Sequence, residues 1–458
     1  MAVQPRAVRK ANERLRIVME EAGSSNTGLA RRVNACGAER GLDLRYDKTS
    51  VARWLQGQQP RGRVPTVIAE ALGRKLGRTV TVDEIGMNPA PVSGPTAGLR
   101  FELTVPDALQ QACALWHDDA RHIGLSATEK LAPSVLVQSS RDWLIADPDP
   151  AATGDGDFTV DPADAGAVRA TAAAFADLDH RFGSSHIRPA TVGYLNSTVA
   201  ELLRGSYHEA TGKQVLGAAA RLTELAGYMA VDIDQLGLAQ RYYIQALRLA
   251  QATDDRDFGG YVLASGMSHV ALLLDNPREA IQLARVAREG LRKGNTTRVR
   301  VICHATEARG YALLGDEYAC EKAIEQASEA LKCSCHEESP DWAAHVDRAY
   351  LAEQLARCYA DLNQFTKAAQ CAQEALQGCP PDRARRRALR LLLLASVQLH
   401  QGQGETDQSR GTAIQAIKVL RRLRSAQCNN ALNSFCERLK ALGERDGTWE
   451  LLCTERQD

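Results

Sequence analysis

The chain has 458 residues, of which 44% are hydrophobic, 24% charged and only 5% aromatic, a composition that fits two to four helical domains and argues against a strand-rich sandwich or barrel. Its net charge is zero, but residues 1–88 carry 16 Lys and Arg against 9 Asp and Glu, while the remainder is net acidic, which suggests that only the basic head meets a polyanion. The longest apolar run, near residues 391–399, falls far short of the roughly 20 residues of a membrane span, and the charged N-terminus does not fit a signal peptide, so we expect a cytoplasmic protein.

The periodicity of residues 1–87 predicts four short helices. A first helix covers about 6–22, and a second begins near Ser25, a good N-cap residue. The third follows Asp47, whose carboxylate can cap it, and ends at Gly57, which tolerates a left-handed turn. A fourth covers 66–77. We expect these helices to pack into one compact domain.

The run WLQGQQPRGRVPTVIAEALG, preceded by a short helix, a connection and another short helix, resembles the phage-repressor and Cro-type helix-turn-helix family, also called XRE-like. The resemblance covers residues 5–80 and departs from the family at residues 34–46, which are longer than the family's tight turn. It implies that the third helix lies in the major groove of double-stranded DNA. The alternative is a four-helix packing module whose arginines are solvated.

Helical spacing turns Val51, Trp54 and Leu55 toward the core and exposes the rest of the third helix. Exposed Arg can pair bidentately with guanine and Gln with adenine, and Ser and Thr can bond either base edge. Phosphate contacts would come from free N–H groups at the start of the second helix and from nearby arginines. The candidate DNA-binding residues are Lys48, Thr49, Ser50, Arg53, Gln56, Asn26, Thr27, Arg31, Arg32, Arg61 and Arg63.

Two breaks in periodicity divide the rest of the chain. Residues 88–100 are rich in Pro, Gly and Ser and predict a linker. A helical connecting region follows over 101–160, with helices expected at 107–122 and 128–146 and an acidic, glycine-rich break before its end.

From 161 to 458 the helical pattern is nearly continuous and repeats itself. Alignment of Ala246, Ala287, Ala330 and Ala375 gives periods of 41, 43 and 45 residues. Each alanine-bearing helix follows a partner helix that ends in a phrase such as RGYAL at 309–313. Small residues at such spacing allow close helix packing.

These pairs resemble tetratricopeptide repeats, which also place Gly and Tyr on one helix and Ala on the next, although their usual period is about 34 residues. Further helices are expected at 382–400, 408–424 and 427–443. The sequence therefore predicts an all-α protein in which a helix-turn-helix domain precedes a right-handed TPR-like solenoid. The resemblance implies that this solenoid is a sensor and dimerisation domain.

Residues 177–183 place two carboxylates beside His180 and Arg181. This pattern fits a helix end with its own ion pairs, or else the polar wall of a ligand pocket. On the second interpretation the ligand-binding candidates are Asp179, Arg181, Arg188 and Tyr194. The arginine run at 383–390 indicates the solvated face of a helix rather than a second nucleic-acid site.

The twelve cysteines are too sparse for a disulfide scaffold, and free thiols are expected. Cys333, Cys335 and His336 lie together, but a zinc site usually needs a second ligand pair at fixed spacing, so we predict core or loop thiols and no metal. The phosphate-loop, dinucleotide, zinc-protease and hydrolase motifs are missing from the sequence, so we predict neither an enzyme nor a cofactor.

A Cro-type head joined to TPR-like repeats resembles actinobacterial transcription regulators of the Streptomyces type and, more distantly, the peptide-sensing regulators of Gram-positive bacteria. The resemblance implies that the head binds an operator and that the repeats sense a small molecule, a peptide or a protein. Because one small head makes few DNA contacts, a homodimer on a palindromic operator is expected. The alternative is an adaptor in which the repeats dock a partner protein and the head is auxiliary.

Overall fold

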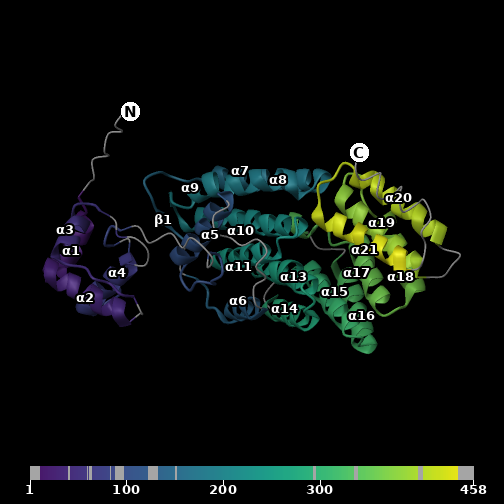
Figure 1. Ribbon diagram of the computed structural model, residues 1–458, viewed down its shortest axis with the longest axis horizontal. Helices are drawn as coiled ribbons and strands as arrows, with labels where there is room; N and C mark the ends of the chain where they lie inside the picture. Colours follow the sequence, from purple (N-terminus) through teal and green to yellow (C-terminus); the bar gives the residue numbers. More distant parts are fainter. Residues whose placement is uncertain are drawn as a thin grey trace. The chain divides into compact units, whose positions relative to one another are not determined.

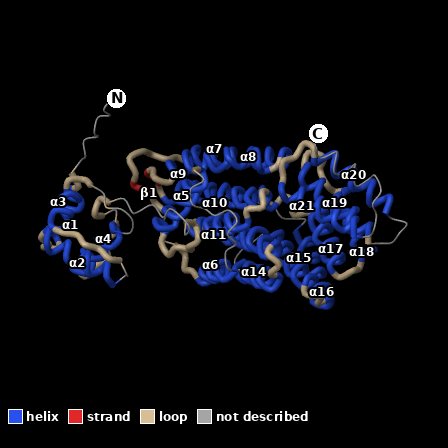
Figure 2. Tube along the Cα trace, in the orientation of Figure 1, coloured by secondary structure: helices blue, strands red, loops and turns tan. Residues whose placement is uncertain are grey.

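The computed structural model describes residues 11–39, 42–58, 60, 64–82, 84–87, 97–121, 133–149, 152–291, 296–334, 339–400 and 406–441. The chain divides into two compact units, Met1–Ser93 (unit 1) and Gly94–Asp458 (unit 2). Figure 2 shows that the described residues are almost entirely helical, and the pairing of β1 (Gly154–Asp155) with β2 (Ser206–Tyr207) is a minor exception. The all-α prediction is confirmed. None of the helices in these ranges is long and apolar enough to cross a membrane.

Unit 1 contains four helices around one apolar core (Figure 1). They are α1 (Glu13–Glu21), α2 (Asn26–Glu39), α3 (Lys48–Leu55) and α4 (Val64–Leu76). The first begins later than expected because Asn12 accepts a hydrogen bond from Leu15 N at 3.0 Å and caps the helix. The fourth begins two residues earlier than expected. Core residues contributed by the four helices include Leu15, Val18, Leu29, Val33, Val51, Trp54, Val67, Ile68 and Leu72.

Residues 97–149 are built into unit 2 rather than forming a separate connection. They contain α5 (Val105–Ala120) and α6 (Pro133–Ile145), whose Trp116 and Trp143 are fully buried in the main core of the unit. Residues 88–96 of the predicted linker, and 122–132 between these helices, lie outside the described residues. The predicted helical connecting region thus shares the hydrophobic core of unit 2.

The helices that follow are arranged largely as consecutive pairs. A long first helix, α7 (Pro162–Phe182), leads through Gly183 into α8 (Ser184–Tyr194), and a π-helical turn at Leu195–Val199 precedes the short α9 (Ala200–Leu202). The pairs that match the predicted repeat are α10 (Glu209–Asp232) with α11 (Leu236–Ala252), α13 (Ser268–Leu273) with α14 (Pro277–Gly290), α15 (Thr297–Leu313) with α16 (Glu317–Cys333), α17 (Arg348–Asp361) with α18 (Phe365–Gln377), and α19 (Ala384–Leu399) with α20 (Thr406–Leu420).

Two further helices complete the order of the described chain. The helix α12 (Arg256–Tyr261) continues through a π-helical turn at Val262–Met267 into α13, and α21 (Ala426–Ala441) ends the described chain. A 3₁₀ turn occupies Asp341–Ala343.

The turns within pairs share one backbone device. Asp234, Asp275, Gly315 and Asn363 each adopt a positive φ, between 57° and 73°, at the turn that joins the first helix of a pair to the second. Gly, Asn and Asp tolerate this left-handed conformation best, and it reverses the chain within a few residues. The recurring Gly, Asn or Asp at these breaks in the sequence is thus the local cause of the pairing.

The end of unit 2 returns to its beginning. In a simple solenoid each pair contacts only its neighbours. Here α19 also packs against α7, and α21 packs against both α19 and α10. This return brings side chains from α10, α17, α19 and α21 around one hollow.

Candidate functional site

The helix α3 of unit 1 is fixed in place at its start and along its buried face. Asp47 caps it by accepting a hydrogen bond from Ser50 N at 2.8 Å, and the pKa of this carboxyl is lowered by its bonds from the Ser50 backbone and hydroxyl. Trp54 is 4% exposed and packs edge-on against Tyr46, with ring centroids 5.0 Å apart. Gly57 follows the helix with φ 86°. The predicted cap, core face and stop of this helix are confirmed.

The long connection before α3 is tied to α2 by one side chain. Asn34 accepts a hydrogen bond from Tyr46 N and donates one to Tyr46 O, both at 2.9 Å. Because Tyr46 also contacts Trp54, this clamp fixes the position of α3 relative to α2. The second helix is extended to Glu39, and the remaining connection is the loop whose length departs from the family's tight turn.

The outward face of α3 carries the predicted polar residues. Lys48, Thr49, Arg53 and Gln56 are exposed and Ser50 is half-buried, while Arg53 donates only a long bond of 3.5 Å to Thr49 O. Within the described part of unit 1, Lys48 and Arg53 form no ion pair. Their charges are therefore not already neutralised by the protein.

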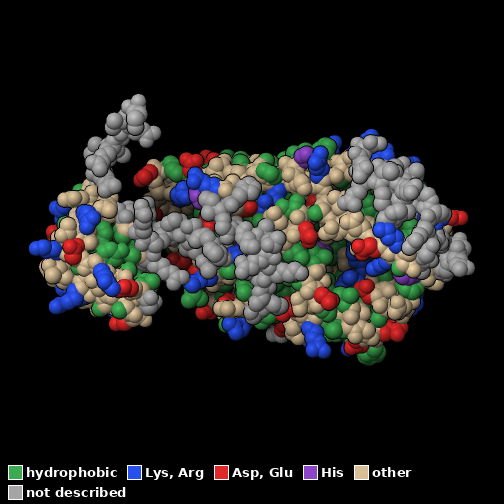
Figure 3. Space-filling model, viewed as in Figure 1, with side chains coloured by type: hydrophobic (Ala, Val, Ile, Leu, Met, Phe, Trp, Pro, Cys, Tyr) green, Lys and Arg blue, Asp and Glu red, His purple; other side chains and the backbone are tan. Residues whose placement is uncertain are grey.

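The other candidates of unit 1 lie mainly on α2. Thr27 and Arg31 are exposed, and Asn26 and Arg32 are half-buried. Ser25 accepts a bond from Gly28 N at 3.1 Å, in agreement with its expected capping position. Lys and Arg side chains are spread over the visible face of this unit (Figure 3). Arg61 and Arg63 lie outside the described residues.

The four ligand-binding candidates of unit 2 do not converge on a pocket. Asp179 is completely buried and forms an ion pair with Arg385. Arg188 is buried against Asp119, at 2.5 Å between Nη2 and Oδ2. Arg181 is exposed and pairs with Asp177 at 3.6 Å, and Tyr194 packs edge-on against Phe175. These contacts favour the ion-pair interpretation of the segment over the pocket-wall interpretation.

The arginine run at 383–390 differs from the expected solvated face. Arg385 and Arg390 are each only 1% exposed. Besides Asp179, Arg385 contacts Asp232 at 3.1 Å and donates to Ser184 Oγ at 2.9 Å. Arg390 donates to Glu353 at 2.9 Å and to two backbone carbonyls. The prediction is wrong for these two residues because their partners lie up to about 200 residues away in the sequence and leave no local signal.

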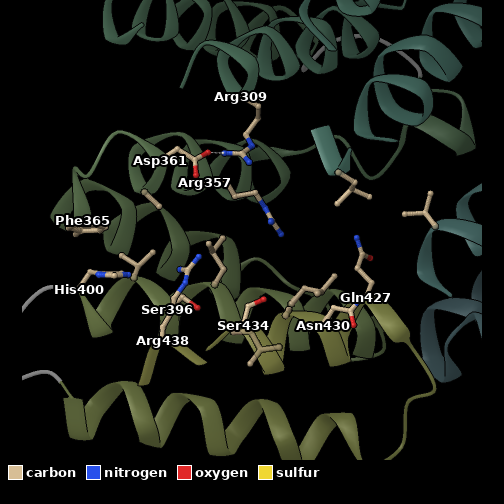
Figure 4. A pocket seen from close by; sticks show the side chains of 18 of the residues that line it. Arg309, Arg357, Asp361, Phe365, Ser396, His400, Gln427, Asn430, Ser434 and Arg438 are labelled. Carbon is tan, nitrogen blue, oxygen red and sulfur yellow. Dashed lines mark hydrogen bonds and ion pairs between the residues drawn. The ribbon is translucent and has the colours of Figure 1, made fainter. Parts of the chain in front are cut away.

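A cavity of about 990 Å³ lies where α19 and α21 return to the earlier helices. Figure 4 shows Arg357 extending into it from α17, and Ser434 and Asn430 facing it from α21. Three arginines and two aspartates lie in its wall, and Arg309 forms an ion pair with Asp361, one of these aspartates. The residues that line it are Val231, Asp234, Leu236, Leu273, Arg309, Arg357, Ala360, Asp361, Asn363, Phe365, Leu389, Leu392, Leu393, Ser396, Val397, His400, Gln427, Asn430, Ala431, Ser434 and Arg438.

Arginines dominate the electrostatics around this cavity. Burial and the charges of Arg357 and Arg309 lower the pKa of His269, which lies behind Gln427, to about 4. Burial and Arg438 lower the pKa of His400 in the wall. Both imidazoles are thus neutral near pH 7, and the arginines supply the positive charge. None of these residues was a sequence candidate, and the only signal was the helical spacing of polar positions on α21.

Polar side chains of α11 bind the first described residues of unit 2. Gln245 donates to the carbonyls of Gly98 and Arg100, both at 2.9 Å, and Arg248 donates to Glu102 O at 2.5 Å. Arg248 also forms a bidentate pair with Asp149, at 2.8 and 2.9 Å. Residues 98–102 at the start of unit 2 are therefore held against α11 by buried and partly buried hydrogen bonds.

The cysteines show no disulfide among the ten that the structure describes. Cys335 and His336 lie outside those residues, and within the described ranges no three His, Cys, Asp or Glu side chains group in a way that could hold a metal ion. Burial raises the pKa of the Cys303 thiol to about 12 and that of Cys428 to about 11. Such thiols are poor nucleophiles near neutral pH.

Comparison with known proteins finds one family model, and it matches only the N-terminal part of the chain. The model of the SP15 N-terminal domain matches residues 15–88, which include all of α2, α3 and α4 and all but the first two residues of α1. No curated protein matches the chain. The match sets unit 1 apart as a domain in its own right, with a boundary close to the end of its described residues.

Proposed function

We propose that this chain is a sequence-specific DNA-binding transcription regulator. In this proposal α3 of unit 1 reads bases in the major groove, and the helix pairs of unit 2 form a TPR-like sensor for a small molecule, a peptide or a protein partner. The observation that carries it is the outward face of α3, where Lys48, Arg53 and Gln56 are exposed on a helix whose position is fixed from behind.

Base reading requires side chains of this kind on a rigid support. Arg and Gln make bidentate bonds to base edges only if their helix is held at a defined angle and depth in the groove. The Asp47 cap, the Trp54–Tyr46 contact and the Asn34 clamp provide such support. In this proposal the exposed Thr27, at the start of α2, and Arg31, one turn further along, contact phosphates.

The helix pairs support the sensing part of the proposal. Their left-handed turns and buried alanines, such as Ala246 and Ala375, follow the spacing that resembles tetratricopeptide repeats. The hydrogen bonds of Gln245 and Arg248 to residues 98–102 give unit 2 a direct hold on the chain that leads to unit 1. A shift of α11 would move that attachment, so ligand binding in unit 2 could change how two heads of a dimer meet a palindromic operator.

The test is selection of DNA duplexes from a random-sequence pool at near-physiological salt. We expect the wild-type protein to recover a shared, palindromic site. Combined Arg53→Ala and Gln56→Ala substitutions should weaken binding to that site by about 30-fold or more, because each bidentate base contact contributes about 1–3 kcal/mol.

The matched control is Arg74→Ala, which removes the same charge from unit 1 at a position already paired with Glu39 and Glu70. It should leave site selection unchanged. Retention that is weak, independent of sequence and lost with added salt, both for the purified protein and after addition of cell extract, would contradict the proposal and favour the adaptor alternative.

A further inference from the structure

The cavity of unit 2 has one apolar wall. Leu389, Leu392, Leu393 and Val397 of α19 line it at the spacing of one helical face, and Leu389 and Leu393 are only half-buried. Unlike most leucines of this unit, these two side chains are not completely covered by the described residues. An apolar stripe that faces a hollow offers a surface for the apolar part of a ligand.

Polar side chains occupy the facing walls. On α21 a single helical face presents Gln427, Asn430, Ser434 and Arg438 to the cavity, while the opposite face of the helix is packed in a core with Phe435 fully buried. Arg357 reaches in from α17 (Figure 4). A polar stripe is usually directed to bulk solvent, and here it lines a concavity.

Two of the three arginines keep most of their hydrogen-bonding capacity. Arg357 makes one bond of 3.3 Å to Glu353, and the other oxygen of that carboxylate accepts a bond of 2.9 Å from Arg390. One carboxylate thus serves two guanidinium groups. Arg438 is exposed and makes no ion pair or hydrogen bond with any residue that the structure describes. Arg309 differs, because Asp361 already neutralises it.

We propose that this cavity binds a small organic anion, with a carboxylate or phosphate held by Arg357 and Arg438 and an apolar body against the leucines of α19. Guanidinium groups suit both kinds of oxyanion, and a volume of 990 Å³ is that of a site for a drug-sized molecule. The neutral donors Gln427, Asn430 and Ser434 would orient the ligand. That this anion is the effector of a regulator rests on the proposed function, but the binding of an anion in the cavity does not.

The experiment uses the full chain without DNA and a panel of probes matched in their apolar body. Isothermal titration calorimetry below the micelle concentration would compare decanoate, decyl phosphate, decanol and decyltrimethylammonium. Acetate and inorganic phosphate test the anion without the apolar body. We expect saturable one-to-one binding of decanoate or decyl phosphate, at least about tenfold weaker binding of the alcohol, and no measurable binding of the cation.

Variants tie the binding to the cavity. Arg357→Gln and Arg438→Gln should each weaken binding of the better anion by about tenfold or more, since each removes a charge-assisted hydrogen bond. Ser434→Trp, at an exposed position of α21, should also weaken it, because the indole would occupy part of the cavity beside Arg438. Arg422→Gln, an exposed arginine after α20 that does not line the cavity, is the control and should bind as the wild type does.

The proposal fails if neither anion binds, or if the alcohol or the cation binds as tightly as the better anion. It also fails if the three cavity variants bind that anion with unchanged affinity. Circular dichroism of each variant checks folding, and Arg438→Gln alone carries the test if Arg357→Gln unfolds. DNA binding is measured in a separate experiment, so anion binding can be interpreted even if the protein does not bind DNA.

Discussion

Some arginines of unit 1 and some of unit 2 have opposite environments. In unit 1, Arg31 and Arg53 extend into solvent, and neither forms an ion pair with a described residue. In unit 2, Arg248, Arg385 and Arg390 are each only 1% exposed, and each forms an ion pair with a carboxylate. The first arrangement leaves charge available for a polyanion, and the second uses charge to hold distant segments of the chain together.

The difference shows that the number of arginines says little about binding. A buried guanidinium stabilises the fold only if its partners compensate the loss of hydration, and it is then unavailable to a ligand. An exposed one contributes little to stability but remains free to act. Arg357 of the cavity is intermediate, because it is half-buried and shares Glu353 with Arg390. Accessibility and pairing therefore separate candidate sites from structural arginines.

We expect the largest effect from removal of the buried Arg385 side chain. Arg385→Met would leave Asp179 and Asp232 buried without their cation, and we expect the free energy of unfolding of unit 2 to fall by about 3–5 kcal/mol. Urea denaturation followed by far-ultraviolet circular dichroism measures this loss. Arg387→Met, a half-buried neighbour on α19, is the matched control and should cost well under half as much. Equal losses would show that the buried cluster is not special.

This cluster also marks the limit of what the sequence could predict. Caps and left-handed turns are local, so the start of α3 at Asp47 and the reversal at Asn363 followed from neighbouring residues. The alanine periodicity likewise predicted the helix pairs. Arg385 and Asp179 are 206 residues apart, and only the return of α19 to α7 brings them together. The cavity depends on the same return, so its residues could not be assembled from the sequence.

A second, smaller effect is expected where unit 2 holds the chain from unit 1. Arg248→Met removes the pair with Asp149 and the bonds to Glu102 O and Leu103 O. We expect a loss of about 2–3 kcal/mol in the free energy of unfolding, together with faster amide hydrogen exchange in residues 97–105. Exchange in α1–α4 should not change. An unchanged exchange rate at 97–105 would mean that other contacts fix this segment.

The smallest expected effect is that of acid on stability. It should distinguish the two units because they differ in histidine content. Residues 1–93 contain no histidine, whereas burial and nearby arginines lower the pKa of His180 to about 2, of His345 to about 3 and of His269 to about 4. In the unfolded chain these groups titrate near 6.5, so below that pH the unfolded state binds protons that the folded state does not. Stability is therefore complete above about pH 6.5 and falls as the pH decreases.

We expect unit 2 to lose at most about 1 kcal/mol per histidine between pH 7 and pH 5.5, and less where the imidazole is partly exposed. Hydrogen exchange followed by mass spectrometry resolves the units within the full chain. The helices α7 and α13, which carry His180 and His269, should lose protection while α3 and α4 keep theirs. His345→Gln should remove its share of the loss, since a side chain that cannot titrate favours neither state as the pH changes. Parallel losses in both units would instead place the acid response in carboxylates, which both units contain.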